Sequence, residues 1–169
     1  MSESKPLVGI LMGSDSDLDV MNETAKVLKD FGVPYEVVVT SAHRSPKRTV
    51  LYANTAEERG IRILVCGAGH AAHLAGVIAA HTTIPVIGVP IDSSALKGLD
   101  SILSTAQMPG GVPVATMAIG KSGAANAGLL AVEILALSDG TLKKKLIQHR
   151  AEMEKKIEEK DRKLRQTAS

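Results

Sequence analysis

The sequence predicts an α/β fold in which helices cover both faces of a central parallel sheet. Five short apolar runs rich in β-branched residues alternate with longer amphipathic stretches, and the runs end in Gly- or Ser-rich turns, as repeated βα units do. Nearly every position in a run is apolar, which predicts strands that are covered on both faces. The predicted strands are 7–12, 34–40, 61–66, 84–89 and 112–119.

Helices are predicted between the strands, which makes the sheet doubly wound. The first spans 16–31 and ends at Gly32, a residue suited to closing a helix. The second begins at Pro46, which is favourable in a first turn, and ends before Gly60. Segment 124–137 carries small and aliphatic residues on nearly every side, so we expect a helix that is buried all round and contacts other subunits.

The end of the chain predicts a docked amphipathic helix. We interpret 1–140 as one α/β domain and 141–169 as a helix of the same domain that packs on another subunit. An autonomous coiled coil is the weaker alternative, because His149 and Lys160 interrupt the heptad seam. The apolar stripe of this helix consists of Leu142, Leu146, Met153, Ile157 and Leu164.

Composition restricts the class of protein. The 169 residues are 44% hydrophobic, enough for one core, yet no run reaches the ~20 apolar residues that span a bilayer. The first residues lack the pattern of an export signal, so we expect a cytoplasmic protein. Cys66 is the only cysteine, which excludes an intrachain disulfide and a multi-cysteine metal site.

The basic excess lies in the C-terminal segment. Residues 141–169 carry 10 Lys and Arg against 5 Asp and Glu, whereas 1–140 carry 10 against 13. Acidic residues interleave with the basic ones, and this segment has no aromatic residue to stack on a base. We therefore interpret it as a solvated helix face and expect neither a nucleic-acid nor a membrane partner.

Two loops at the carboxyl ends of predicted strands contain groups that suit a phosphorylated ligand. Loop 13–17 places Ser14 and Asp17 at a helix start, where backbone N–H groups bind anions; a simple helix cap is an equally good interpretation. In loop 41–46, Ser41, His43 and Arg44 precede a proline-started helix. Arg suits bidentate phosphate binding, and an imidazole transfers protons near neutral pH, so His43 is the candidate acid and base.

A third loop, 67–76, is glycine-rich and leads into a helix. It does not complete a G-x-G-x-x-G fingerprint, and no acidic ribose ligand follows about 20 residues later. Small residues here favour a close approach of the backbone to a ligand. His70 and His73 have a spacing that two metal ligands can use, but no carboxylate or thiol accompanies them, so we expect no metal site.

Together these loops resemble the 5-(carboxyamino)imidazole ribonucleotide mutase family of purine synthesis, also called PurE, class I. The resemblance covers nearly all of residues 7–137, and its motifs occur in the family's order. The matching segments are MGSDSD at 12–17, SAHRSP at 41–46, GAGHAAHLAG at 67–76, LKGLDS at 96–101 and QMPGGVPVAT at 107–116.

The resemblance implies a flavodoxin-like three-layer fold, a homo-octamer with active sites where subunits meet, and no metal, nucleotide or redox cofactor. It implies that a small-molecule ribonucleotide is the substrate and that its carboxylate moves from the exocyclic nitrogen to the ring carbon. His43 would be the acid and base. The substrate-binding residues carried over by position are Ser14, Asp17, Ser41 and Arg44 for ribose and phosphate, and Gly69, Ala71, His73 and Leu74 for the carboxylate pocket.

Two alternatives remain. A related branch uses free carbon dioxide and usually carries Lys at the position of Arg44, so a carbon dioxide-dependent carboxylase is the alternative within the enzymes. A signalling receiver domain is the alternative of another class, since it shares the parallel sheet, acids after the first strand and a Lys near the fifth, here Lys121. However, the third strand ends in Cys66 and Gly67 and offers no phosphoacceptor Asp.

The chain also departs from the family at several positions. His70 stands where the family usually has Gly, and Ala75 where it usually has Pro. Thr105 and Ala106 replace the usual Ile-Val pair. We expect His70 to point to solvent or to a neighbouring subunit.

Overall fold

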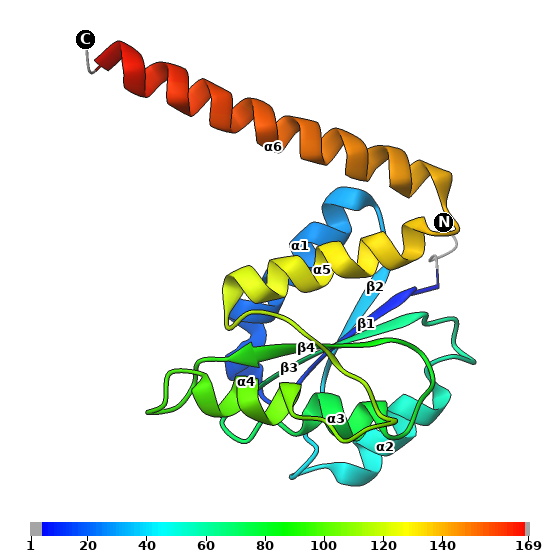
Figure 1. Cartoon of the computed structure of the whole chain (residues 1–169). Helices are drawn as coiled ribbons and strands as arrows, with labels where there is room; N and C mark the ends of the chain where they lie inside the picture. The colour runs from blue at the N-terminus through cyan, green and yellow to red at the C-terminus, as the bar shows by residue number, and fades with distance from the viewer. Residues whose placement is uncertain (1–4, 168–169) are drawn as a thin grey trace. The chain divides into compact units, whose positions relative to one another are not determined.

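The computed structural model describes residues 5–167 and contains a five-stranded, all-parallel sheet (Figure 1). The strand order is β2-β1-β3-β4-β5, which is the flavodoxin-like order. The predicted parallel α/β fold is confirmed. The strands are β1 (Val8–Met12), β2 (Tyr35–Val39), β3 (Ile63–Gly69), β4 (Val86–Ile91) and β5 (Ala115–Thr116).

Helices cover both faces of the sheet, which gives the three layers (Figure 1). α1 and the first part of α5 lie on one face, where Thr24 Oγ1 donates to the Ala124 carbonyl at 2.7 Å. α2, α3 and α4 lie on the other. The helices are η1 (Asp15–Asp17), α1 (Leu18–Phe31), α2 (Pro46–Thr55), α3 (Leu74–Ala79), α4 (Leu99–Ala106), α5 (Lys121–Ala136) and α6 (Gly140–Thr167).

The helix boundaries follow the local sequence signals closely. Gly32 ends α1 in the left-handed conformation at φ 73°, and its N–H bonds to the carbonyls of Leu28 and Lys29, as predicted. Pro46 occupies the first turn of α2. This helix ends at Thr55, earlier than predicted, and hydrogen-bonded turns continue to Gly60, which adopts φ 96°.

The core lies around β1, β3 and β4. Every residue of β1 and β4 is buried, as the apolar runs predicted. The prediction was wrong for β2, in which Val37 and Val39 are exposed. β2 pairs only with β1 and therefore forms an edge of the sheet, where less structure covers its side chains.

The fifth strand is much shorter than the eight residues predicted. Only Ala115 and Thr116 pair in register with β4. Pro113 has no backbone N–H and cannot donate to β4. Pro90 of β4 also has no N–H, although its carbonyl accepts a hydrogen bond from the N–H of Gly120. The two prolines therefore limit the ladder to its central pair of residues.

The expectation that α5 is buried all round is not met within the single chain. Ala124, Ala127 and Ala131 are buried, but Leu129 and Leu130 are only half-buried. The exposed side of this helix keeps the apolar character that prompted the expectation of subunit contacts.

The chain divides into two compact units, Met1–Ala131 and Val132–Ser169. In the second unit, Asp139 caps α6 by accepting from the N–H groups of Thr141 and Leu142 at 2.8 and 3.1 Å. Arg150 of α6 pairs with Glu133 at 3.3 Å. Among the predicted stripe, Met153, Ile157 and Leu164 are exposed, so their packing on another subunit stays a prediction. None of the described helices has both the length and the apolar composition to cross a membrane.

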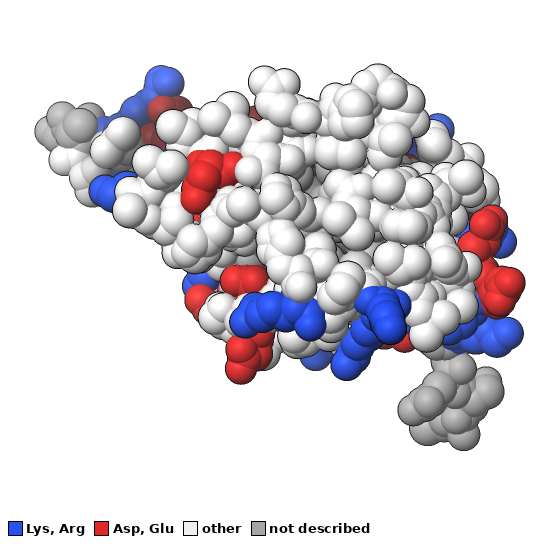
Figure 2. Space-filling model, turned by 90° about the horizontal axis from the view of Figure 1, so that it is seen from below, with Lys and Arg blue, Asp and Glu red and all other residues white. Residues whose placement is uncertain are grey.

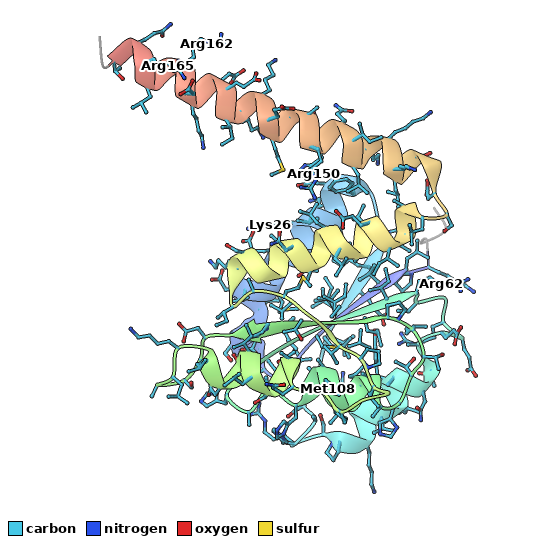
Figure 3. All side chains as sticks on the ribbon, viewed as in Figure 1. Lys26, Arg62, Met108, Arg150, Arg162 and Arg165 are labelled. Atoms are coloured by element: carbon cyan, nitrogen blue, oxygen red, sulfur yellow. The ribbon has the colours of Figure 1, made fainter. Side chains whose placement is uncertain are left out.

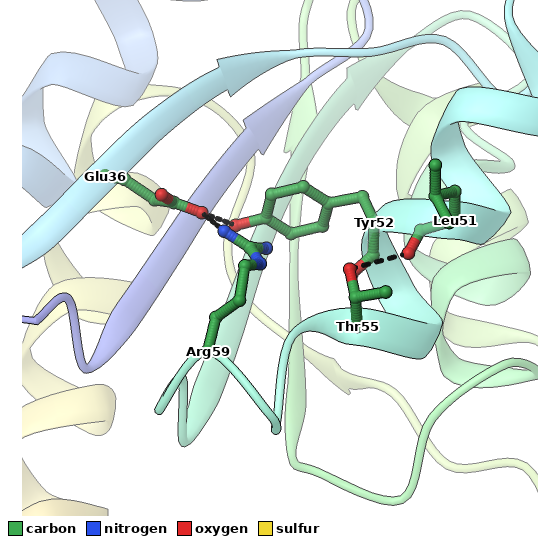
Figure 4. Close-up of polar contacts among 5 residues, drawn as sticks. All are labelled: Glu36, Leu51, Tyr52, Thr55 and Arg59. Carbon is green, nitrogen blue, oxygen red and sulfur yellow. Dashed lines mark hydrogen bonds and ion pairs between the residues drawn. The ribbon is translucent and has the colours of Figure 1, made fainter.

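A polar cluster of three side chains joins β2 to α2 and the turn after it (Figure 4). Glu36 accepts from Tyr52 Oη at 2.6 Å and from Arg59 Nη1 at 2.5 Å. The Arg59 guanidinium also stacks over the Tyr52 ring at 4.4 Å from its centroid. Burial and the bond to Glu36 raise the pKa of Tyr52, so its hydroxyl remains a donor, and the cluster fixes α2 against the edge strand.

Candidate functional site

The carboxyl ends of β1, β2 and β3 bring the three candidate loops together. The chain passes from β1 to β2 on one side and then to β3 on the other side of β1, so the strand order reverses between β1 and β3. Ligands of open parallel sheets bind beyond the strand ends at such a point. Loops 13–17 and 41–45 begin at this edge, as predicted. The predicted start of the third loop at Gly67 was wrong, because β3 continues to Gly69 and the loop begins at His70.

A pocket of about 280 Å³ opens between these loops. Among the predicted site residues it is lined by Ser14, Asp17, Arg44 and Gly69. The other five predicted residues do not line it: Ser41, His43, Ala71, His73 and Leu74. The structure therefore groups one cation, one acid and hydroxyl and backbone groups in a space suited to a polar ligand.

Arg44 connects the loops after β1 and β2. Its guanidinium Nη2 donates to the Gly13 carbonyl at 2.9 Å, and its backbone N–H donates to Ser41 Oγ at 3.1 Å. The Ser41 N–H in turn donates to Ser45 Oγ at 2.9 Å. Arg44 is exposed, so its remaining N–H groups are available to an anion. Ser41 thus supports the loop that presents Arg44.

Asp17 is the buried acid of the pocket. Burial raises its pKa above the ordinary value, and hydrogen bonds from Ser14 and Ser16 and the charge of Arg44 offset this only in part. Ser14 Oγ also accepts from the Ser16 N–H at 3.4 Å and so caps the short η1 helix. The loop thus contains both a capped helix start and an acid that lines the pocket, so neither interpretation excludes the other.

His43 and His73 contact each other outside the residues that line the pocket. His43 Nε2 and His73 Nδ1 are 2.8 Å apart, and the rings form an edge-to-face pair with centroids 4.9 Å apart. His43 follows β2 and His73 follows β3, so the sheet brings together two imidazoles that the sequence separates by 30 residues. Both side chains are exposed and therefore open to a substrate. The pairing itself was not predicted from the sequence.

The loop after β3 lies close to the loop after β4. A Cβ atom added at Gly69 would lie 1.7 Å from Ser93 Oγ, so only glycine allows this approach. The next residue, His70, adopts φ 54°, and its Nδ1 is 3.0 Å from Ser93 Oγ. Both His70 and Ser93 line the pocket. Ser93 was missed by the sequence reasoning, although its position just after β4 at the same sheet edge was a usable signal.

The segment after α4 approaches the same region. A Cβ atom added at Gly76 of α3 would lie 3.0 Å from Met108 Sδ, so Met108 packs against the start of α3 (Figure 3). Leu74, the first residue of α3, is buried in the core, whereas Ala71 is exposed. Within residues 5–167, no three His, Cys, Asp or Glu side chains are grouped as metal ligands would be.

Comparison with known proteins gives one consistent family. The model of the family described as AIR carboxylase matches residues 7–156. The N5-carboxyaminoimidazole ribonucleotide mutase of Pyrococcus horikoshii is 57% identical over 164 residues, 97% of this chain and 92% of that protein. The mutase of the same name from Bacillus subtilis is 58% identical over 146 residues, 86% and 90% of the two chains.

The fold agrees with that of a solved relative. The crystal structure of Treponema denticola PurE superimposes with a TM-score of 0.85 at 31% identity. The match covers 94% of this chain and 98% of the other. The match therefore extends over nearly the whole of both chains.

Proposed function

This chain belongs to the AIR carboxylase family, and we propose that it catalyses the N5-carboxyaminoimidazole ribonucleotide mutase reaction of purine biosynthesis. The reaction moves a carboxylate from the exocyclic nitrogen of the aminoimidazole ribonucleotide to its ring carbon. The observation that carries the proposal is the identity of more than half the residues with curated mutases over nearly the whole chain.

We assign the ribose and phosphate of the substrate to the pocket between the loops. Ser14 and Asp17 provide a hydroxyl and a carboxylate, which suit sugar hydroxyls, and Arg44 provides the cation for phosphate. Ser41 orients the Arg44 backbone through its hydroxyl. This assignment places the imidazole of the substrate toward His43 and His73.

We assign both proton transfers to His43. The His43 imidazolium protonates the carbamate nitrogen, the carbon–nitrogen bond breaks, and carbon dioxide leaves. The ring carbon then attacks the trapped carbon dioxide, and the now neutral His43 removes the ring proton, so the cycle ends with the proton where it began. Holding the two fragments in one closed site keeps the second step effectively unimolecular.

His73 and its loop complete the proposed carboxylate pocket. The His43–His73 bond fixes the orientation of both imidazoles. Backbone groups of Gly69 and Ala71 provide donors for a carboxylate, and the buried Leu74 anchors the loop. No cofactor takes part in this scheme.

We also propose that the enzyme is a cytoplasmic homo-octamer. Seen from the side of α2, α3 and α4, the surface is largely uncharged, with charged side chains gathered toward its edges (Figure 2). Leu51 of α2 and Leu99 and Leu103 of α4 are exposed. Apolar surface of this kind supports contacts with further copies of the chain.

The decisive experiment supplies the purified protein with N5-carboxyaminoimidazole ribonucleotide without ATP and follows the ultraviolet spectrum of the product. A short reaction in ¹³C-bicarbonate is then analysed by mass spectrometry. A mutase that traps carbon dioxide yields unlabelled product. A carbon dioxide-dependent carboxylase yields labelled product from aminoimidazole ribonucleotide, and absence of conversion would contradict the mutase proposal.

A further inference from the structure

His70 occupies a backbone conformation that histidine rarely adopts. Its φ of 54° lies in the left-handed region, and Lys97 at φ 49° is the other non-glycine residue with positive φ within residues 5–167. Glycine takes this conformation at no steric cost, whereas a side chain there is strained. The presence of an imidazole at this position is thus a reason to search for its contacts.

The ring is held in place and faces the substrate pocket. Ser93 Oγ lies 3.0 Å from His70 Nδ1, and both residues line the pocket together with Asp17 and Arg44. Within the described part of the chain, His70 Nε2 makes no hydrogen bond to protein. When Ser93 donates to Nδ1, or when the ring carries both protons, Nε2–H is a free donor.

Without His70, the residues that line the pocket carry no net positive charge to balance a phosphate. Without His70, the pocket holds one cation, Arg44, and one acid, Asp17, whose charges cancel when both are ionised. A ribonucleotide brings a phosphate, and a nearby anion favours the imidazolium form of a histidine. Outside the pocket, the Ser94 hydroxyl and then the backbone N–H groups of Ser101 and Asp100 lower the pKa of Asp100 at the start of α4, and His70 contributes least to this shift.

We propose that His70 is a further substrate-binding residue, which Ser93 positions so that Nε2–H donates to the substrate phosphate beside Arg44. This inference rests on the proposed function and deepens it. Ser93 is a positioning residue, since it acts through the His70 ring. The proposed carboxylate pocket at His43 and His73 adjoins this pocket, since Gly69 is assigned to the first and lines the second.

The test compares His70→Asn and His70→Gly with wild type by calorimetric binding of ribose 5-phosphate. Both replacements tolerate positive φ, and neither carries a charge. We expect affinity for ribose 5-phosphate to fall about tenfold, as for loss of one charge-assisted hydrogen bond. The KM of the nucleotide should rise by a similar factor with kcat changed less than about twofold.

Two further variants separate binding from backbone effects. Lys97→Gly relieves the same kind of backbone strain and removes a positive charge outside the pocket, so it should leave the affinity unchanged. Ser93→Ala should weaken binding by about threefold, and that loss should vanish when His70 is already Asn. Additive effects of the two substitutions would contradict the positioning role.

Failure of the inference can be told apart from failure of the proposed function. Folded His70 variants that bind ribose 5-phosphate as tightly as wild type would overturn the inference, even if KM for the nucleotide changed. A wild-type protein that binds ribose 5-phosphate with loss of affinity in the variants, but does not convert the nucleotide, would contradict the mutase proposal alone.

Discussion

Nε2 of His43 lies 2.8 Å from Nδ1 of His73, and the two rings are nearly perpendicular at 82°. One of the two nitrogens must carry the proton of this hydrogen bond and the other must accept it. The bond therefore fixes the orientation of the His43 ring and engages one of its two nitrogens. His73 is the residue whose loss should disturb His43 without removing it.

His73→Phe should lower kcat about fivefold, because loss of one hydrogen bond costs about 1 kcal/mol and frees the His43 ring to rotate. KM should rise as well, since His73 is also assigned to the carboxylate pocket. Steady-state kinetics with the nucleotide measures both constants. His73→Asn retains a side chain that can bond to His43 and should recover part of the rate. Equal kcat for wild type and the Phe variant would exclude an orienting role.

His43→Asn should lower turnover by about 10²–10⁴-fold, since the same imidazole is assigned as acid and as base. The side chain is exposed, so the thermal unfolding midpoint should stay within about 2 °C of wild type. His81→Asn, which replaces an exposed histidine after α3, is the matched control and should retain full activity. A His43→Asn protein with a tenth of wild-type activity would show that another group transfers the protons.

Asp17→Asn should make the protein more stable at neutral pH while weakening substrate binding. Burial raises the folded-state pKa of Asp17 above 3.8, so between the two pKa values the folded state holds more protons and stability falls as pH rises. The penalty is fully present at pH 7, and Asn removes it. We expect a midpoint about 1–2 °C higher at pH 7 and no gain below pH ~4, measured by thermal melts. An equal gain at both pH values would exclude this cause.

Tyr52→Phe should destabilise the fold by about 1–2 kcal/mol without changing kcat, because it removes the 2.6 Å bond to the Glu36 carboxylate. That loss corresponds to a fall of about 2–8 °C in the unfolding midpoint. Burial alone would raise the pKa of Glu36. The hydrogen bonds from Tyr52 and Arg59 outweigh this effect and lower the pKa of Glu36 below its ordinary value. Tyr35→Phe, on the same edge of the sheet, serves as the control, and a similar loss of stability there would contradict a specific role of the cluster.

Truncation after Asp139 should weaken assembly, since α6 exposes Ile147, Met153, Ile157 and Leu164. Light scattering should show species smaller than those of the full chain at the same concentration. Replacing Lys155 and Lys156 by Ala alters the charge of the helix without removing its apolar stripe and should leave assembly intact. An assembly of unchanged size after truncation would show that α6 is peripheral.

Sequence patterns predicted the parts of the fold that local chemistry determines. The apolar runs located β1, β3 and β4 because these strands are buried on both faces, and Gly32 and Pro46 marked helix ends through their own backbone preferences. Exposure of Val37 depends on which strand lies at the sheet edge, a property of pairing that the composition of the run does not record. The length of β5 likewise depends on Pro90 in another strand.

The sequence predicted which residues belong to the candidate site, but it did not predict the contacts between their side chains. The motif residues Ser14, Asp17 and Arg44 follow from the strand-end rule and the family resemblance, and the structure brings them into one pocket. The contact of His43 with His73 and the approach of Ser93 to His70 join loops from different strands. Such contacts depend on the path of each loop after its strand ends, which the motifs did not specify.

At His70 the requirements of stability and of ligand binding differ, because the left-handed backbone favours glycine whereas the proposed phosphate contact needs the imidazole. Glycine there would relieve the backbone, so selection for stability alone would remove the imidazole. An engineer who seeks a more heat-resistant enzyme would find this substitution among the first to raise the melting temperature. A screen for melting temperature in the absence of substrate would select that substitution without detecting the loss of the proposed phosphate contact.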